Sequence, residues 1–190
     1  MPAKQLANYL PDVAAFASML LLAAVADIVL HSMDLPEVGL YAGYAGSALI
    51  VLSFWYSIRK RKMLTWGSPR ALLMLHKVAA WLGPVLVLIH GGIHFNAVLP
   101  WVAMLSMVVV VASGLTGSFL LGRARGELAE KRRELLAGGA SAEEADARLH
   151  YEALAVGIMK RWRVAHMPIT AVFAVLALLH VATVLMFWSW

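Results

Sequence analysis

The chain of 190 residues contains no cysteine, and this absence removes several classes of site at once. Disulfide bonds, haem attached through a C-x-x-C-H motif, cysteine-ligated iron–sulfur clusters and thiolate zinc sites are all excluded. Charged residues are also scarce, at 14% of the chain, whereas 62% of the residues are hydrophobic and the mean hydropathy is +0.76. A soluble core cannot hide so much apolar surface, so the composition predicts helices embedded in lipid.

Five apolar stretches are long enough to cross about 30 Å of hydrocarbon, which takes about 20 helical residues. Lipid offers no partner for an unpaired backbone group, and the stretches lack the alternation of barrel strands, so each is predicted to be a helix. We expect one all-α domain over residues 1–190, with the first stretch retained as a helix because it lacks the pattern of a cleaved signal. The five transmembrane helices are expected near residues 12–31, 39–58, 72–95, 99–121 and 164–188.

The net charge of +5 is concentrated in two connections between the expected helices. Lys and Arg crowd residues 59–70 and 123–163, whereas the connection at 32–38 contains Asp34 and Glu37 and no basic residue. Because cytoplasmic loops of membrane proteins are enriched in Lys and Arg, we expect the basic connections and the N-terminus on the cytoplasmic side of the cell membrane. Orientation and lipid contact explain the charge, and we expect no nucleic acid as a partner.

Residues 122–163 are predicted to form a cytoplasmic helical hairpin. One amphipathic helix is expected to end at Gly138-Gly139, and Ser141 with Glu144 fits the capping box that begins a second. The simplest role is a solvated connection, in which His150 is an exposed residue. The alternative is a docking platform for a separate redox protein or flavoprotein subunit, since the segment is too short for a nucleotide-binding domain and has no G-x-G-x-x-G motif.

Four of the seven histidines form two pairs with equal spacing. Fourteen residues separate His76 from His90 in the third expected helix and His166 from His180 in the fifth. This interval advances a helix by about 1400°, close to whole turns, and by about 21 Å, so each pair shares a face and spans two depths of the membrane. Both helices are expected to begin on the cytoplasmic side, which brings His76 level with His166 and His90 level with His180.

Two facing imidazoles at one level can hold a b-type haem without covalent attachment. We therefore expect two haem b groups, with the inner iron held by His76 and His166 and the outer iron by His90 and His180. A single membrane histidine is more often a hydrogen-bonding residue between helices, but four at matched intervals favour haem. A proton relay or metal channel would add carboxylates along the same path, and zinc ligands would converge at one level.

The histidines and their neighbours also carry a resemblance to a known family. The motif residues are His76-Lys77, His90-Gly91-Gly92-Ile93-His94-Phe95-Asn96, Gly114-Leu115-Thr116-Gly117, His166 and His180. Over about residues 70–185 they resemble the transmembrane haem domain of ferric reductases and NADPH oxidases. The resemblance implies the same four ligands and places His94 beside the outer haem, near the electron acceptor. Larger members of that family carry a flavin and nicotinamide domain that this sequence does not contain, so a separate electron donor or acceptor is expected.

Several further residues are candidates for supporting roles. Haem propionates need cationic partners near the membrane surface, although orientation and anionic lipid explain such charges equally well. The candidates at the inner level are Arg70, Lys77, Lys160, Arg161 and Arg163. Glycines can admit a porphyrin edge or serve helix packing alone. The glycines in question are Gly83, Gly91, Gly92, Gly114 and Gly117.

Asp27 is the acidic residue that lies well inside an expected helix, and His31 follows one turn later on the same face. Together with His94 they are the candidate catalytic residues of an outer site for proton handling or quinone binding. Two hydrated residues at the membrane interface would give the same pattern.

The sequence as a whole predicts a diheme b-type cytochrome, the membrane subunit of an oxidoreductase. It would carry electrons between a cytoplasmic-side redox partner and an outer-side acceptor. A quinol-oxidising or quinone-reducing cytochrome b subunit is one alternative. A histidine-lined transporter or structural membrane subunit without redox chemistry is the other.

Overall fold

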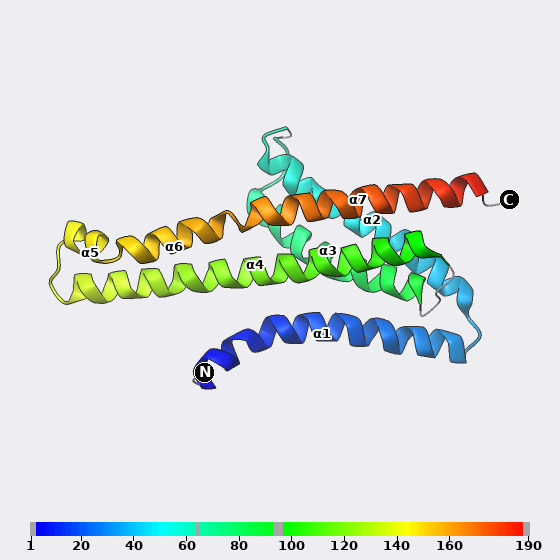
Figure 1. The fold of residues 1–190 in the computed structure, drawn as a ribbon, viewed down its shortest axis with the longest axis horizontal. Helices are drawn as coiled ribbons and strands as arrows, with labels where there is room; N and C mark the ends of the chain where they lie inside the picture. The colour runs from blue at the N-terminus through cyan, green and yellow to red at the C-terminus, as the bar shows by residue number, and fades with distance from the viewer. Residues whose placement is uncertain (1–2, 64, 93–96, 188–190) are drawn as a thin grey trace.

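The protein is all-α, as predicted. The computed structural model describes residues 3–63, 65–92 and 97–187, and these residues form helices and connections without a strand. The helices are α1 (Ala3–Ser32), α2 (Pro36–Lys60), α3 (Pro69–Gly91), α4 (Val98–Ala137), α5 (Ala142–Arg148), α6 (His150–Lys160) and α7 (Trp162–Phe187) (Figure 1). Five of them, α1, α2, α3, α4 and α7, are long and apolar enough to cross a membrane, which is compatible with an integral membrane protein.

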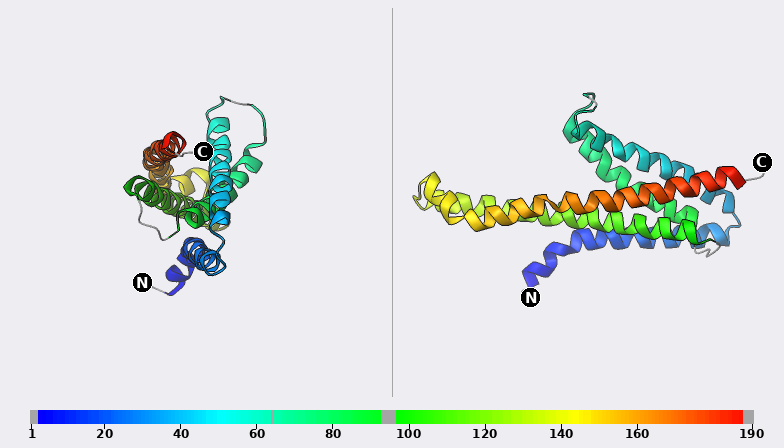
Figure 2. Two further views of the ribbon diagram at one scale, coloured as in Figure 1. Left: turned by 90° about the vertical axis from the view of Figure 1, so that its right-hand side faces the viewer. Right: turned by 45° about the horizontal axis from the view of Figure 1, so that its top comes forward.

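The long helices alternate in direction along the chain (Figures 1 and 2). Helices α1, α3 and α7 run in one sense, and α2 and α4 run in the other. The chain reverses direction twice between α3 and α7, so these two helices are parallel, as the sequence predicts. This arrangement decides which histidines of the two helices lie level with one another.

The bundle consists of two antiparallel pairs, α2 with α3 and α4 with α7. Helices α2 and α3 approach closely because glycine faces glycine, and a Cβ added to Gly46 would lie 2.8 Å from the carbonyl oxygen of Gly83. Directly packed helices have axes about 8–10 Å apart, which brings some of their Cα atoms well within 8 Å of each other. In the described parts of α3 and α7, no two Cα atoms come within 8 Å, so these helices stand apart.

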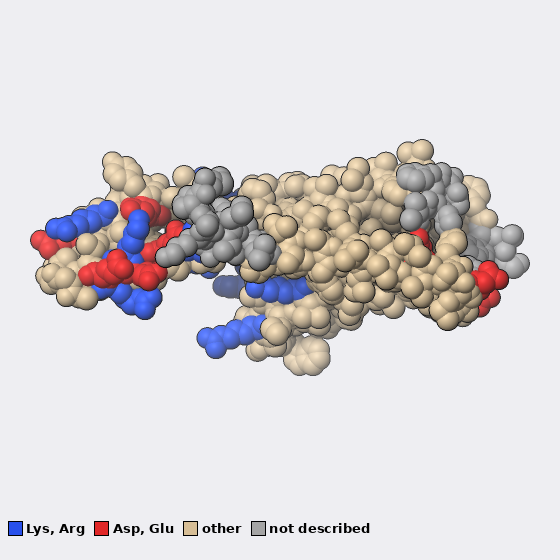
Figure 3. Space-filling model, turned by 90° about the horizontal axis from the view of Figure 1, so that it is seen from below, with Lys and Arg blue, Asp and Glu red and all other residues tan. Residues whose placement is uncertain are grey.

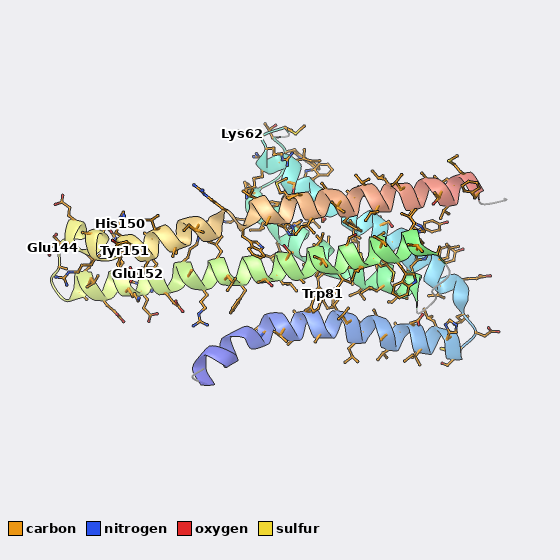
Figure 4. All side chains as sticks on the ribbon, viewed as in Figure 1. Lys62, Trp81, Glu144, His150, Tyr151 and Glu152 are labelled. Carbon is orange, nitrogen blue, oxygen red and sulfur yellow. The ribbon has the colours of Figure 1, made fainter. Side chains whose placement is uncertain are left out.

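The buried core is small and joins α1, α3 and α4. Its fully buried centre includes Met19 and Val85, with Val111 beside them. The indole Nε1 of Trp81 on α3 donates a hydrogen bond to the carbonyl oxygen of Ala15, 2.9 Å away, which ties α1 to the bundle (Figure 4). Many large apolar side chains face outward instead, as lipid-facing side chains do.

Charge is segregated along the molecule. In the view of Figure 3, Lys, Arg, Asp and Glu gather at the end that carries α5 and α6, and the middle of the bundle is mostly uncharged. The connection between α2 and α3 lies at the end of the five-helix bundle where α7 begins, on the side from which α5 and α6 extend (Figure 1). The two basic connections therefore lie toward one end, as the predicted topology requires.

Helix ends follow from local capping. The hydroxyl of Ser68 accepts a hydrogen bond from the backbone N–H of Ala71 at 3.2 Å, and Pro69 occupies the first turn, so α3 begins at a sharp N-cap. At its other end, Gly92 adopts a φ of 53°, which side-chain-bearing residues rarely adopt, and α3 stops at Gly91 rather than at the expected residue 95.

The hairpin differs from the prediction in one respect. Helix α4 runs for 40 residues, so the fourth span and the first hairpin helix are one continuous helix. Glycine lowers helix stability without ending a helix, and the ion pair between Arg123 and Glu127, 2.6 Å apart, supports the turn that follows Gly122. The helix ends before Gly138, and Ser141 and Glu144 form the predicted capping box.

Helices α5 and α6 fold back along the extension of α4. Arg132 of α4 contacts Asp146 of α5 at 2.7 Å, and Lys131 contacts Glu152 of α6 at 3.3 Å. The labelled side chains of Glu144, His150, Tyr151 and Glu152 in Figure 4 mark this end of the molecule. His150 is exposed, as predicted.

The ion pair between Arg132 and Asp146 generates the first testable prediction. The hydrogen bond and positive charge of Arg132 hold the pKa of the Asp146 carboxyl below its usual range. A lowered pKa in the folded state means that the pair stabilises the hairpin above the usual carboxyl pKa and loses this effect as the pH falls through the lowered value. Arg132→Gln should raise the pKa of Asp146 in an NMR titration, whereas Arg133→Gln should leave it unchanged; equal effects of the two variants would contradict the assigned pair.

Candidate functional site

The structure brings the four spaced histidines together in two pairs. His76 and His90 lie on α3, and His166 and His180 lie on α7. His166 lies close enough to His76 for their charges to interact, and His180 interacts with His90 in the same way. The two levels are separated by about 21 Å along each helix. This is the pairing expected from equal intervals on parallel helices.

Both α3 imidazoles are tied to the backbone of α2. The Nδ1 atom of His76 lies 2.9 Å from the carbonyl oxygen of Ser53, and that of His90 lies 3.1 Å from the carbonyl oxygen of Gly39. A carbonyl oxygen only accepts hydrogen bonds, so the neutral ring must carry its proton on Nδ1 and keep a lone pair on Nε2. Metal-ligating histidines have this arrangement, in which a bond at one nitrogen orients the ring and makes the other nitrogen more basic.

The inner histidine of α7 is held by α4. Ser113, which is 9% exposed, places its hydroxyl 3.1 Å from Nδ1 of His166. Its carbonyl oxygen accepts a hydrogen bond of 2.9 Å from Nε1 of Trp162, one turn before the histidine. A Cβ added to Gly114 would lie 3.5 Å from Cε1 of His166, so the backbone of α4 passes directly beside the ring.

Most of the glycines singled out from the sequence are accounted for by helix packing. A Cβ on Gly83 would meet α2, one on Gly91 would run into Met104, and one on Gly117 would run into the indole of Trp162. Gly92 serves the end of α3. Among these five residues, Gly114 is the one that borders a histidine of the site.

An aromatic ring and two cations lie at the inner level. Tyr56 of α2 stacks on the ring of His76, with ring centroids 5.5 Å apart and planes at 29°. Lys60 Nζ lies 3.4 Å from the hydroxyl of Tyr56. Arg61 reaches from the end of α2 to α7, where its guanidinium lies 3.5 Å from the sulfur of Met167. A thioether is a weak acceptor for a guanidinium, so Arg61 keeps hydrogen-bonding capacity beside the inner pair.

In the described part of the chain, the structure gives no specific side-chain contact for the cations that the sequence predicts as propionate partners. The side chains of Arg70, Lys77 and Arg161 are exposed near the inner level. Arg163 and Lys160 lie in the described helices, but their side chains lie outside the described part. Arg61 is not among the cations predicted from the sequence to bind propionates, and its guanidinium contacts Met167, the residue that follows His166.

Two of the three residues predicted for the outer catalytic site lie in the described part of the chain. Asp27 is partly exposed and His31 is exposed, both on α1. Helix α1 packs against α2, α3 and α4, and in the described residues its Cα atoms stay more than 8 Å from those of α7, which carries His180. His94 lies at residues 93–96, outside the described residues, so its expected position beside the outer pair stays a prediction.

Across the residues that the structure describes, no group of three or more His, Asp or Glu side chains converges to hold a metal ion. Compared with known proteins, the chain matches no family model, no curated protein and no solved structure. The functional evidence therefore consists of the two histidine pairs and the helices that orient them.

The contact between Ser113 and His166 generates a second prediction. Ser113→Ala removes the hydroxyl from a membrane-embedded ring nitrogen and should lower the free energy of unfolding in detergent by about 1 kcal/mol. Ser106→Ala is the matched control on α4, because the Ser106 hydroxyl donates a hydrogen bond of 2.7 Å to the carbonyl oxygen of Ala103 in its own helix. Thermal unfolding that affects both variants equally would contradict a specific bond to His166.

Proposed function

We propose that the protein is a diheme b-type cytochrome that serves as the membrane subunit of an oxidoreductase. One haem would be held by His76 and His166, and the other by His90 and His180. The observation that carries this proposal is that His166 interacts electrostatically with His76, and His180 with His90, on helices that run in the same sense. The resemblance of these residues to the ferric reductase and NADPH oxidase haem domain points to the same chemistry.

Three features of the residues fit a planar group between the rings. Helices α3 and α7 keep their described Cα atoms more than 8 Å apart, although their histidines interact. The Nδ1 bonds of His76 and His90 leave Nε2 as the atom free to ligate. His90 is exposed on its helix, and an imidazole uncovered in hydrocarbon is costly unless a bound group covers it.

When bound, haem b supplies reversible one-electron chemistry at iron. The chain itself would fix the two sites about 21 Å apart along the helices, which covers most of the hydrocarbon thickness. Two imidazoles at each level would hold the iron, and such ligation would favour electron transfer over direct binding of a substrate to the metal. Arg61 and the exposed cations at the inner level would hold anionic propionates there.

The topology supports a proposed orientation. The basic connections and the N-terminus would lie on the cytoplasmic side of the cell membrane, because Lys and Arg are enriched in cytoplasmic loops. The extension of α4 then carries α5 and α6 into the aqueous phase, where a separate redox protein or flavoprotein subunit would dock. Exposed apolar side chains on α6, such as Tyr151 at 82% and Ile158 at 64%, support a protein contact on this hairpin.

Purified full-length protein tests the proposal directly. Reduction with dithionite should give b-type absorption bands, and a pyridine haemochrome assay should find two haems per chain. A colourless preparation from haem-sufficient cells would contradict the proposal and favour a membrane protein without redox chemistry.

The pairing of ligands makes a sharper prediction. His90→Ala and His180→Ala should each remove the same haem and leave the other spectroscopically intact, because each variant removes one ligand of the outer pair. His76→Ala and His166→Ala, made separately, should each remove the inner haem and leave the outer one intact. His150→Ala, in the exposed hairpin, is the control and should keep both. Loss of different haems in the His90 and His180 variants, resolved by redox titration, would refute the pairing.

A further inference from the structure

Both α3 imidazoles take their hydrogen-bond acceptors from one neighbouring helix at matched spacing. The carbonyl oxygens of Ser53 and Gly39 are fourteen residues apart on α2, and their partners His76 and His90 are fourteen residues apart on α3. Because α2 and α3 run antiparallel, a single register between them satisfies both contacts. A shift of α2 along α3 would break both bonds together.

The contact between Gly46 of α2 and Gly83 of α3 lies midway between these bonds. Gly46 is seven residues from each acceptor on α2, and Gly83 is seven residues from each histidine on α3. Seven residues are close to two helical turns, so the contact and both bonds share one face. A Cβ on Gly46 would lie 2.8 Å from the carbonyl oxygen of Gly83, and one on Gly83 would lie 3.1 Å from that of Gly46. The backbones of the two helices are in contact there, so an added side chain would force the helices apart.

A third glycine touches the outer ring itself. A Cβ added to Gly43, one turn along α2 from Gly39, would lie 2.6 Å from both Cγ and Nδ1 of His90. The imidazole of His90 therefore packs directly against the backbone of α2 at Gly43. The inner ring is supported differently, because Tyr56 stacks on His76.

We propose that α2 is the positioning element for both α3 imidazoles. The contact between Gly46 and Gly83 sets the register of α2 on α3. In this register the α2 carbonyl oxygens accept hydrogen bonds from Nδ1–H of both rings, which orients Nε2 of each ring toward α7. Gly43 supports the outer imidazole, that of His90, and not the inner one. The role of the rings as haem ligands rests on the proposed function, but their orientation by α2 does not depend on haem.

Small residues also mediate simple packing of membrane helices, and this explanation makes a different prediction. If the glycines only allowed α2 and α3 to approach, alanine at Gly43 would lower stability without singling out one histidine. If they position the rings, alanine at Gly43 changes the outer site alone, and alanine at Gly46 changes both sites.

The test compares three alanine variants of the full chain in detergent. Gly43→Ala should weaken outer haem binding by about 10–100-fold, the usual effect of removing support from a metal-ligating histidine, and leave the inner haem's midpoint potential unchanged. Gly46→Ala should disturb both haems. Gly126→Ala on α4 is the control and should leave both haems unchanged, because a Cβ added to Gly126 would meet no described atom within 4 Å. Equal loss of both haems in Gly43→Ala, or a wild-type outer haem in it, would overturn the proposal.

A measurement without haem separates this inference from the proposed function. In apo protein labelled with ¹⁵N-histidine, NMR at about pH 8 reports which nitrogen of each neutral ring carries the proton. His76 and His90 should both carry it on Nδ1, and Gly43→Ala should alter the signals of His90 only. Protons on Nε2 in the wild-type rings would overturn the positioning role even if haem binds. Failure of wild-type protein to bind haem would refute the proposed function and leave this test standing.

Discussion

An imidazole placed among apolar helices needs hydrogen-bond partners for its ring nitrogens, and this requirement organises the bundle. Helix α2 meets it for α3 through the backbone oxygens of Ser53 and Gly39, and α4 meets it for His166 through Ser113. Each histidine-bearing helix is therefore packed against an antiparallel neighbour on one side. His76 interacts electrostatically with His166, and His90 with His180, although α3 and α7 do not pack directly in the described residues.

The same constraint explains why the molecule has so small a core. The tight contacts lie within the pair formed by α2 and α3 and the pair formed by α4 and α7, and α1 joins them through Trp81 and a few buried side chains. Helices α3 and α7 do not pack directly, so a bound planar group would contribute to the stability of the bundle as well as to its chemistry. Beyond the bundle, α4 continues as one helix, against whose extension α5 and α6 pack.

The features predicted from the sequence are those that depend on residue type and period. Long apolar runs gave the five helices, and the equal intervals from His76 to His90 and from His166 to His180 gave the two pairs. The uninterrupted course of α4 was missed because the change from apolar to charged residues at Gly122 resembles a helix end but only marks a change of surroundings.

The supports of the histidines could not be predicted in the same way. Any residue supplies a backbone carbonyl, so nothing in the identity of Ser53 or Gly39 indicates an acceptor. Their roles follow from the register of α2 on α3, which is set where Gly46 meets Gly83. Arg61 was overlooked because its contact with Met167 depends on how the end of α2 approaches α7.

A cryo-electron microscopy map of the purified protein in lipid nanodiscs tests the central claim most directly. We predict two planar densities, one joining Nε2 of His76 to His166 and the other joining Nε2 of His90 to His180. A map in which α3 and α7 pack against each other, with their imidazoles bonded only to protein, would contradict it.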